Sequence, residues 1–157
     1  MAAIFLFQLT AEFPRCHAAP GDVDLSFNAG SGVNGYVAAV ALQPGGKLII
    51  GGGFSSVKGL IRPGIARLNG DGSGDSSFVH PGPNSSVNAV GPVVLQPDGK
   101  ALLGYADGIR RLNSDGTIDE TFILPQVETV EGFAVPVDCI ALQPDGKILN
   151  SGRFSFL

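Results

Sequence analysis

The sequence contains no tryptophan, and it has only two tyrosines, two histidines and two cysteines. Two cysteines cannot form the disulfide framework of a small secreted domain. A Ser/His/Asp arrangement needs one well-placed histidine. His17 lies in a segment that we expect to be removed, and His80 stands in the loop-like stretch VHPGPN. The sequence therefore predicts neither a disulfide scaffold nor a histidine-dependent enzyme.

Charged residues are also scarce, at 15% of the chain, and the formal net charge is −4. An acidic chain without a basic run has no electrostatic footprint for nucleic acid and no polybasic segment for an anionic membrane surface. The motifs HExxH, CxxC, Walker A and GxGxxG are absent from the sequence. Each of these motifs would indicate a metal, redox or nucleotide site. We therefore expect no cofactor, no catalytic residues and no nucleic-acid partner, and we leave the partner open as a protein or a glycan.

The N-terminus has the outline of a secretory signal. A short apolar run, MAAIFLFQL, is followed by small residues in CHAAPGD. Such a run before a small-residue cleavage site is typical of signal peptides, and it is too short to span a bilayer. We expect a signal peptide over residues 1–19, with a buried N-terminal strand as the alternative. This predicts a secreted or cell-surface protein without a transmembrane segment.

Glycine and proline are abundant, with 23 and 11 residues, and apolar residues make up 44% of the 157 residues. Both glycine and proline interrupt helices and serve turns. The apolar content is sufficient for one core, and the length is that of about one domain. This composition favours an all-β domain built from many short strands.

One hexapeptide recurs three times, as LQPGGK at 42–47 and LQPDGK at 95–100 and 142–147. A second motif, RLNGDGSGDSSF at 67–78, recurs as RLNSDGTIDETF at 111–122. The N-terminal fragment GDVDLSF, which ends at Phe27, matches only the tail of this second motif. The spacing of about 45–53 residues is that of propeller blades.

The first two repeats each contain four candidate strands, and the third contains the first two of them. The first is an apolar run before the hexapeptide, at 37–43, 91–96 and 137–143, and such runs suit buried strands. The Pro-Asp-Gly or Pro-Gly-Gly turn leads to a second strand (KLIIGG, KALLGY, KILNSG), and IARLN and IRRLN form a third. DSSF and DETF form a short fourth strand anchored by phenylalanine. This pattern predicts four-stranded antiparallel blades of a β-propeller-like fold.

Equivalent positions of the repeats should have equivalent environments. We expect Leu42, Leu95 and Leu142 to be buried alike, and Phe78 and Phe122 to be buried alike. Cys139 lies in an apolar run, where we expect a small buried thiol. The stretch between the second and third strands is nine residues longer in the first repeat, so we expect an exposed loop there.

The motifs L-Q-P-D-G-K, R-L-N-x-D-G and D-x-x-F together resemble the delta-60 repeat of secreted bacterial proteins. The resemblance covers residues 20–157, with repeats at about 28–78, 79–122 and 123–157. It implies a β-propeller-like fold, an extracellular or cell-surface setting and an uncharacterised scaffold, with no catalytic residues to carry over. Asn150-Ser151 departs from the Ile50-Gly51 and Leu103-Gly104 of the earlier repeats, which puts the packing of that strand in question.

The aspartates of the second motif are weak candidates for calcium. Asn69, Asp71 and Asp75 recur as Asn113, Asp115 and Asp119, and oxygen ligands at alternate positions suit this ion. However, glycine follows the first aspartate of each pair directly, which is typical of a hairpin turn. We favour the interpretation that these carboxylates satisfy nearby backbone amides, so we expect no metal site.

The repeats amount to about two and a half blades, whereas a closed propeller has about 4–8. We expect a fragment of a longer protein, with assembly from several chains as the alternative. The sequence predicts a non-enzymatic extracellular scaffold for binding or surface architecture. Two alternatives stay open. One is a carbohydrate-binding module, with only Tyr36 and Tyr105 for stacking besides phenylalanine, and the other is an enzyme with a channel-face active site.

Overall fold

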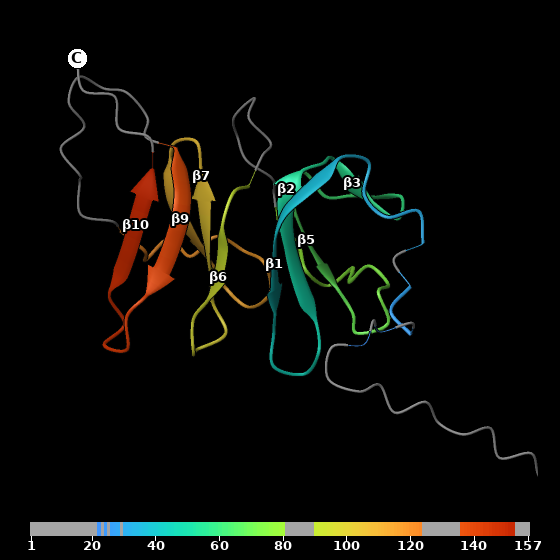
Figure 1. The fold of residues 1–157 in the computed structure, drawn as a ribbon, viewed down its shortest axis with the longest axis horizontal. Helices are drawn as coiled ribbons and strands as arrows, with labels where there is room; N and C mark the ends of the chain where they lie inside the picture. The colour runs from blue at the N-terminus through green and yellow to red at the C-terminus, as the bar shows by residue number, and fades with distance from the viewer. Residues whose placement is uncertain are drawn as a thin grey trace, which may run out of the picture.

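The computed structural model describes residues 22, 24, 26–28, 30–80, 90–123 and 136–152. All regular structure within them is β-strand (Figure 1). The predicted signal peptide at 1–19 lies outside the described residues. None of the described residues forms a helix that could cross a membrane. The strands are β1 (Tyr36–Leu42), β2 (Leu48–Gly53), β3 (Ser56–Val57), β4 (Leu60–Ile61), β5 (Ile65–Leu68), β6 (Val93–Leu95), β7 (Ala101–Tyr105), β8 (Gly108–Leu112), β9 (Val137–Leu142) and β10 (Ile148–Gly152).

Three small antiparallel sheets stand side by side, one for each repeat (Figure 1). The first sheet has the order β1-β2-β5, the second has the order β6-β7-β8, and the third contains β9 and β10. A separate hairpin, β3-β4, lies beside the first sheet. The fold is therefore all-β and β-propeller-like, as predicted, with incomplete blades among the described residues.

The repeated hexapeptide closes the same hairpin in every repeat. Its glutamine N–H donates to the lysine carbonyl at 2.7 Å in the first repeat, 2.8 Å in the second and 2.9 Å in the third. The last glycine of the turn has a φ of 83°, 85° and 83° in the three copies. Only glycine adopts such a φ freely, so the hexapeptide recurs because each repeat needs this turn.

The predicted fourth strand does not form. In the first repeat it is reduced to an isolated bridge between Leu68 and Gly74, and in the second to one between Leu112 and Ile118. The following residues are turns. The cause is local, because the aspartate of D-x-[ST]-F accepts a hydrogen bond from the backbone two residues later, and this Asx turn competes with a strand.

The longer stretch in the first repeat also differs from the expected exposed loop. It forms the β3-β4 hairpin, and Val57 bridges to Val33. The side chain of Val57 is buried, whereas that of Ile61 is 77% exposed. The insertion therefore contributes a buried side chain as well as surface.

Each sheet has two faces, because successive side chains of a strand point to opposite sides. We call the face toward the preceding repeat upstream and the face toward the following repeat downstream. One buried cluster joins the downstream face of the first sheet, with Ile49 and Ile65, to the upstream face of the second, with Ala101 and Leu103. Another joins Leu102 of the second sheet to Ile140 of the third. These two clusters are equivalent interfaces between sheets. A third cluster lies on the upstream face of the first sheet, where Phe27 and Val33 pack against buried residues that include Ile50 and Leu68.

The expectation that the three repeat leucines are buried alike is wrong for Leu42, which is 67% exposed. Leu95 and Leu142 are partly buried and pack against the two cores. All three occupy the same register, opposite Leu48, Ala101 and Ile148. They point upstream. Among the described residues no sheet of another repeat covers the upstream face of the first sheet, which Phe27, Val33 and Val57 cover in part. The three leucines are equivalent in register, but only Leu95 and Leu142 have a preceding sheet to pack against.

The two phenylalanines occupy equivalent places. The expectation that they are buried alike is wrong, because Phe78 is fully buried in the first core, whereas Phe122 is only partly buried against the second. Arg67 and Arg111 cover their rings, with the guanidinium carbon 4.9 Å and 4.5 Å from the ring centre. Cys139, in contrast, is exposed rather than buried, because it points to the downstream face of the third sheet.

Candidate binding surface on the first sheet

Each D-x-[ST]-F motif ends against the turn of the next repeat. The Val79 N–H donates to the Asp115 carbonyl at 3.0 Å, and the Phe78 ring lies so close to Gly116 that an added Cβ would approach it to 3.1 Å. The N-terminal motif makes the same contact one repeat earlier, since the Asn28 N–H donates to the Asp71 carbonyl at 3.0 Å. The segment that ends at Phe27 therefore docks on the first sheet as Phe78 docks on the second.

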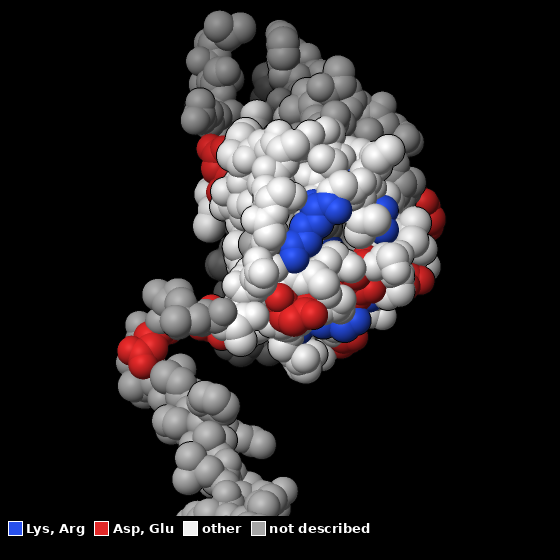
Figure 2. Space-filling model, turned by 90° about the vertical axis from the view of Figure 1, so that its right-hand side faces the viewer, with Lys and Arg blue, Asp and Glu red and all other residues white. Residues whose placement is uncertain are grey.

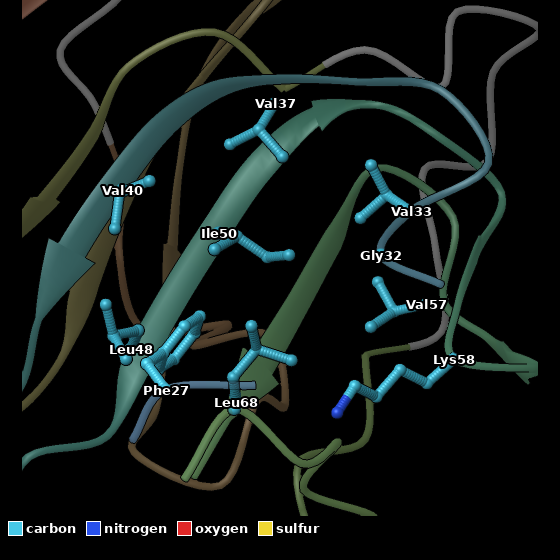
Figure 3. A pocket seen from close by; sticks show the side chains of 11 residues that line it. Phe27, Gly32, Val33, Val37, Val40, Leu48, Ile50, Val57, Lys58 and Leu68 are labelled. Carbon is cyan, nitrogen blue, oxygen red and sulfur yellow. The ribbon is translucent and has the colours of Figure 1, made fainter. Parts of the chain in front are cut away.

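A cavity of about 340 Å³ lies between this segment and the upstream face of the first sheet. Figure 3 shows Phe27, Leu48 and Leu68 together at one end of it and Val33 and Val57 at the other. Apart from Lys58 and two glycines, the lining consists of aliphatic and aromatic side chains, completed by Val37, Val40 and Ile50. The equivalent spaces of the second and third sheets are filled by the neighbouring sheet.

The surface around the cavity is apolar and accessible. Val37, Val40 and Leu42 of β1 are 42%, 58% and 67% exposed. Figure 2 views the molecule from this side, and uncharged atoms cover most of the upper part of the described surface, with charged atoms grouped in its middle and lower parts. A contiguous apolar patch on a soluble protein commonly marks a site of interaction. We refer to Val37, Val40, Leu42 and Leu48 as the open face.

Lys58 is the only cation among the described residues that line the cavity. Its backbone has a φ of 48°, which is unusual for a residue with a side chain. The Nζ atom donates to the Asn28 carbonyl at 2.5 Å. Lys58 therefore ties the N-terminal segment to the β3-β4 hairpin. Holding this segment is a sufficient role for it.

The four candidate calcium aspartates are engaged in two types of local contact. Asp71 and Asp115 accept hydrogen bonds from the backbone N–H and hydroxyl of the residue two positions later, Ser73 and Thr117, at 2.6–2.9 Å. These bonds, the side-chain one foremost, lower the pKa of both carboxyls. No group of three or more potential metal-ligating side chains is found within the described part of the chain.

The second aspartate of each pair adds an ion pair to the same turn. Asp75 Oδ2 lies 2.7 Å from both Lys47 Nζ and Arg67 Nε. Asp119 Oδ2 lies 2.7 Å from Lys100 Nζ and 2.8 Å from Arg111 Nε. These contacts fasten the hexapeptide lysine and the third-strand arginine of one repeat to its own D-x-[ST]-F motif.

These ion pairs change the acidity of both carboxyls. Burial alone would raise the pKa of Asp75, but hydrogen bonds from Lys47, Ser77 and Arg67 outweigh it and hold the pKa well below its ordinary range. The hydrogen bond from Lys100 is the main cause of the equally low pKa of Asp119. Both carboxylates are therefore ionised at neutral pH.

His80, the histidine outside the predicted signal, is buried rather than exposed in a loop. Its Nδ1 lies 3.3 Å from the Gly116 carbonyl, and its Nε2 lies 3.3 Å from the Tyr105 hydroxyl. Burial lowers the pKa of His80 and raises the pKa of Tyr105 to about 12. Arg110 stacks on the other side of Tyr105, 4.3 Å from the ring centre. The group fills the space between the first and second repeats.

Sequence reasoning located the aspartates and the lysines but missed the open face and the buried histidine. The repeat pattern contains a signal for the open face, since the first repeat has an upstream face like the others. A model of a beta-propeller family, the domain of unknown function DUF5122, matches residues 43–78 and 96–122. No curated protein and no solved structure matches the chain. The match to the family model supports a propeller-repeat family, in agreement with the three sheets.

Proposed function

We propose that the chain is a non-enzymatic β-propeller repeat scaffold of the delta-60 type that acts outside the cell by binding. The observation that carries this proposal is the open face, where exposed aliphatic side chains surround a cavity with an almost wholly apolar lining. Burial of such a surface against a partner is favourable, at roughly 25 cal/mol per Å² of apolar area. The surface is suited to association and offers no group for chemistry.

The polar residues of the repeats support a structural rather than a catalytic role. Asp75 and Asp119 are each held by a lysine and an arginine. His80 is buried, and its pKa is lowered by that burial. A nucleophile needs an adjacent base with a third group to orient it, and the motif side chains are instead paired with one another.

An apolar fluorescent dye tests whether the open face binds. The dye should bind wild-type protein, and Val40→Asp should remove most of the binding because it places a charge on the open face. Ile61→Asp is the matched control, since Ile61 is 77% exposed on the β3-β4 hairpin outside the cavity lining. Equal dye binding by all three proteins, each with an unchanged melting temperature, would contradict the proposal.

Two further measurements address setting and ligand class. Fractionation of the native host should place the protein in the medium or at the cell surface, and a cytoplasmic location would contradict an extracellular role. A glycan array tests the carbohydrate-binding alternative. Tyr105 is buried while Tyr36 is 60% exposed, so an array signal that is lost in Tyr36→Ala would replace the scaffold proposal with the lectin one.

A further inference from the structure

We propose that the open face of the first sheet binds the downstream face of the third sheet of a second copy of this chain, head to tail. The inference rests on the proposed binding function and names the partner. It is based on two observations that are independent of each other. First, the upstream face of the first sheet and the downstream face of the third resemble the two sides of the sheet-to-sheet interface that the molecule already contains twice. Second, a lysine beside one face and an aspartate beside the other correspond to the two partners of an ion pair found in the first and second repeats.

The downstream face of the third sheet matches the faces that are buried inside the molecule. Leu149 occupies the register of Ile49 and Leu102. Ile49 and Leu102 are 1% and 0% exposed, whereas Leu149 is 55% exposed. The neighbouring Cys139 and Ala141 are also exposed, and they stand at the positions of Ala39 and Ala41, which pack against the first core. This face therefore has the small and aliphatic side chains that meet an upstream face elsewhere.

The open face is the matching half. Leu42 stands where Leu95 and Leu142 stand, and both of these pack against the downstream face of the preceding sheet. Val40 occupies the position of Val93 and Ile140, which are buried. The proposed contact thus continues an established interface, with a second copy supplying the missing sheet. Such a contact joins two different surfaces of the same chain and is heterologous.

The charges at the two faces are complementary. Lys47 and Lys100 each bind the aspartate of the D-x-[ST]-F motif of their own repeat, at 2.7 Å. Lys147 is the third such lysine, but its Nζ turns back to Asp145 at 2.6 Å, and its side chain is 75% exposed.

Asp24 is the third such aspartate. Its Oδ1 accepts from Ser26 as in the other motifs, and no ion pair to it is found among the described residues. In the head-to-tail contact, Lys147 of one copy meets Asp24 of the next.

One position makes the contact weaker than the internal interfaces. An added Cβ at Gly51 or Gly104 would lie 2.8 Å from Val93 or 3.1 Å from Val137 of the following sheet. The third repeat has Ser151 at this position. The hydroxymethyl group holds the incoming sheet away, so we expect reversible association rather than a permanent assembly.

Charge reversal and mixing test the contact. Asp24→Lys alone and Lys147→Glu alone each place two like charges opposite each other in the contact between copies. Each should weaken self-association roughly tenfold, because an attraction is lost and a repulsion is added. An equimolar mixture of the two variants pairs every lysine with a carboxylate and should recover wild-type association. Sedimentation velocity over a concentration series measures all three. A contact between two like faces would show no such recovery.

Substitutions on the apolar part of the contact provide the controls. Leu149→Asp should reduce self-association at least about thirtyfold, as expected for a central apolar contact. Ser151→Gly should strengthen it several-fold, and Ile61→Asp should leave it unchanged. Melting curves show whether each variant is folded. Alkylation of Cys139, followed by peptide mass spectrometry, should slow as wild-type protein is concentrated.

Several results would overturn the inference. They are a wild-type protein that stays monomeric at high micromolar concentration, association that Leu149→Asp leaves intact, and single charge variants that neither lose affinity nor recover it on mixing. A monomer whose open face still binds the apolar dye would overturn only the partner assigned here. A monomer that does not bind the dye would overturn the proposed function as well.

Discussion

The first and second sheets contain the same hairpin, closed by hexapeptides that differ at one residue, Gly45 or Asp98. The leucine of the hexapeptide is nevertheless exposed in the first sheet and partly buried in the second. Leu95 packs against the first core, whereas Leu42 is 67% exposed. The backbone geometry of the two turns is nearly identical, with φ values of 83° and 85° at Gly46 and Gly99. The repeat thus determines the turn, the register and the direction of each side chain. Burial is determined by whether another sheet stands on that side.

The two ends of the stack extend this comparison. Ile49 and Leu102 point downstream into a core, and Leu149 points downstream into solvent. Each of these two faces therefore retains the side chains of an interface between sheets without a neighbouring sheet, although Phe27 and Val33 cover part of the first one. The same substitution at equivalent positions of two repeats should then change the free energy of unfolding by very different amounts.

The largest expected difference is between Leu102→Ala and Leu149→Ala. Leu102 is fully buried, so its truncation should cost about 3 kcal/mol through lost burial and a cavity. Leu149 is 55% exposed, and its truncation should cost less than about 1 kcal/mol. Urea unfolding in dilute solution measures both free energies. Equal losses would mean that the third sheet is covered in solution and that the comparison fails.

A smaller difference is expected between two aspartates of the same motif. Asp75→Asn removes the acceptor of two charge-assisted hydrogen bonds and should cost about 1–2 kcal/mol. Asp24→Asn keeps a side-chain oxygen for Ser26 and should leave stability almost unchanged. Urea unfolding again compares them. An Asp24→Asn loss as large as that of Asp75→Asn would show that Asp24 has a partner within its own chain.

Acidification should act through the interface between the first and second repeats. Burial lowers the pKa of His80 below its ordinary value of 6.5, so below that pH the unfolded chain binds more protons than the folded one. Stability is therefore present above about pH 6.5 and is lost as the pH falls toward the folded pKa.

The melting temperature should fall between pH 7 and pH 5, and it should fall less in His80→Gln, which keeps a hydrogen-bonding group between Tyr105 and Gly116. If the melting temperature depended on pH identically in wild-type protein and His80→Gln, the loss of stability in acid would have to come from groups other than His80.

The smallest effect is expected from calcium. The carboxylates of Asp71, Asp75, Asp115 and Asp119 already accept hydrogen bonds or form ion pairs, so calcium would have to displace these contacts. Melting in calcium and then in a chelator should give the same temperature. A large rise with calcium would mean that the ion binds the folded chain and that the repeats share a metal site.

Local chemistry made much of the fold predictable. The Pro-Gly-Gly or Pro-Asp-Gly turn defines its own hairpin, so the positions of β2, β7 and β10 followed from the hexapeptide. The equivalence of Phe78 and Phe122 followed from their place in the second motif. In each case the residues that decide the structure lie within a few positions of one another.

Features that depend on distant neighbours could not be predicted in the same way. The exposure of Leu42 and Cys139 depends on which sheets stand beside theirs. The burial of His80 depends on Tyr105, which comes 25 residues later. The fourth strand failed for a local reason, since the Asx turn at Asp75 and Asp119 competes with strand pairing. The open face was missed because an apolar strand has the same sequence whether or not a neighbour covers it.

Hydroxyl-radical footprinting in dilute solution tests most directly whether neighbours rather than sequence decide burial. The three leucines of the hexapeptide have the same chemistry and the same register, so their oxidation rates report exposure alone. Leu42 should be oxidised several-fold faster than Leu95, with Leu142 also slower than Leu42. Equal rates at Leu42 and Leu95 would contradict the account, because they would mean that the first sheet is covered as completely as the second.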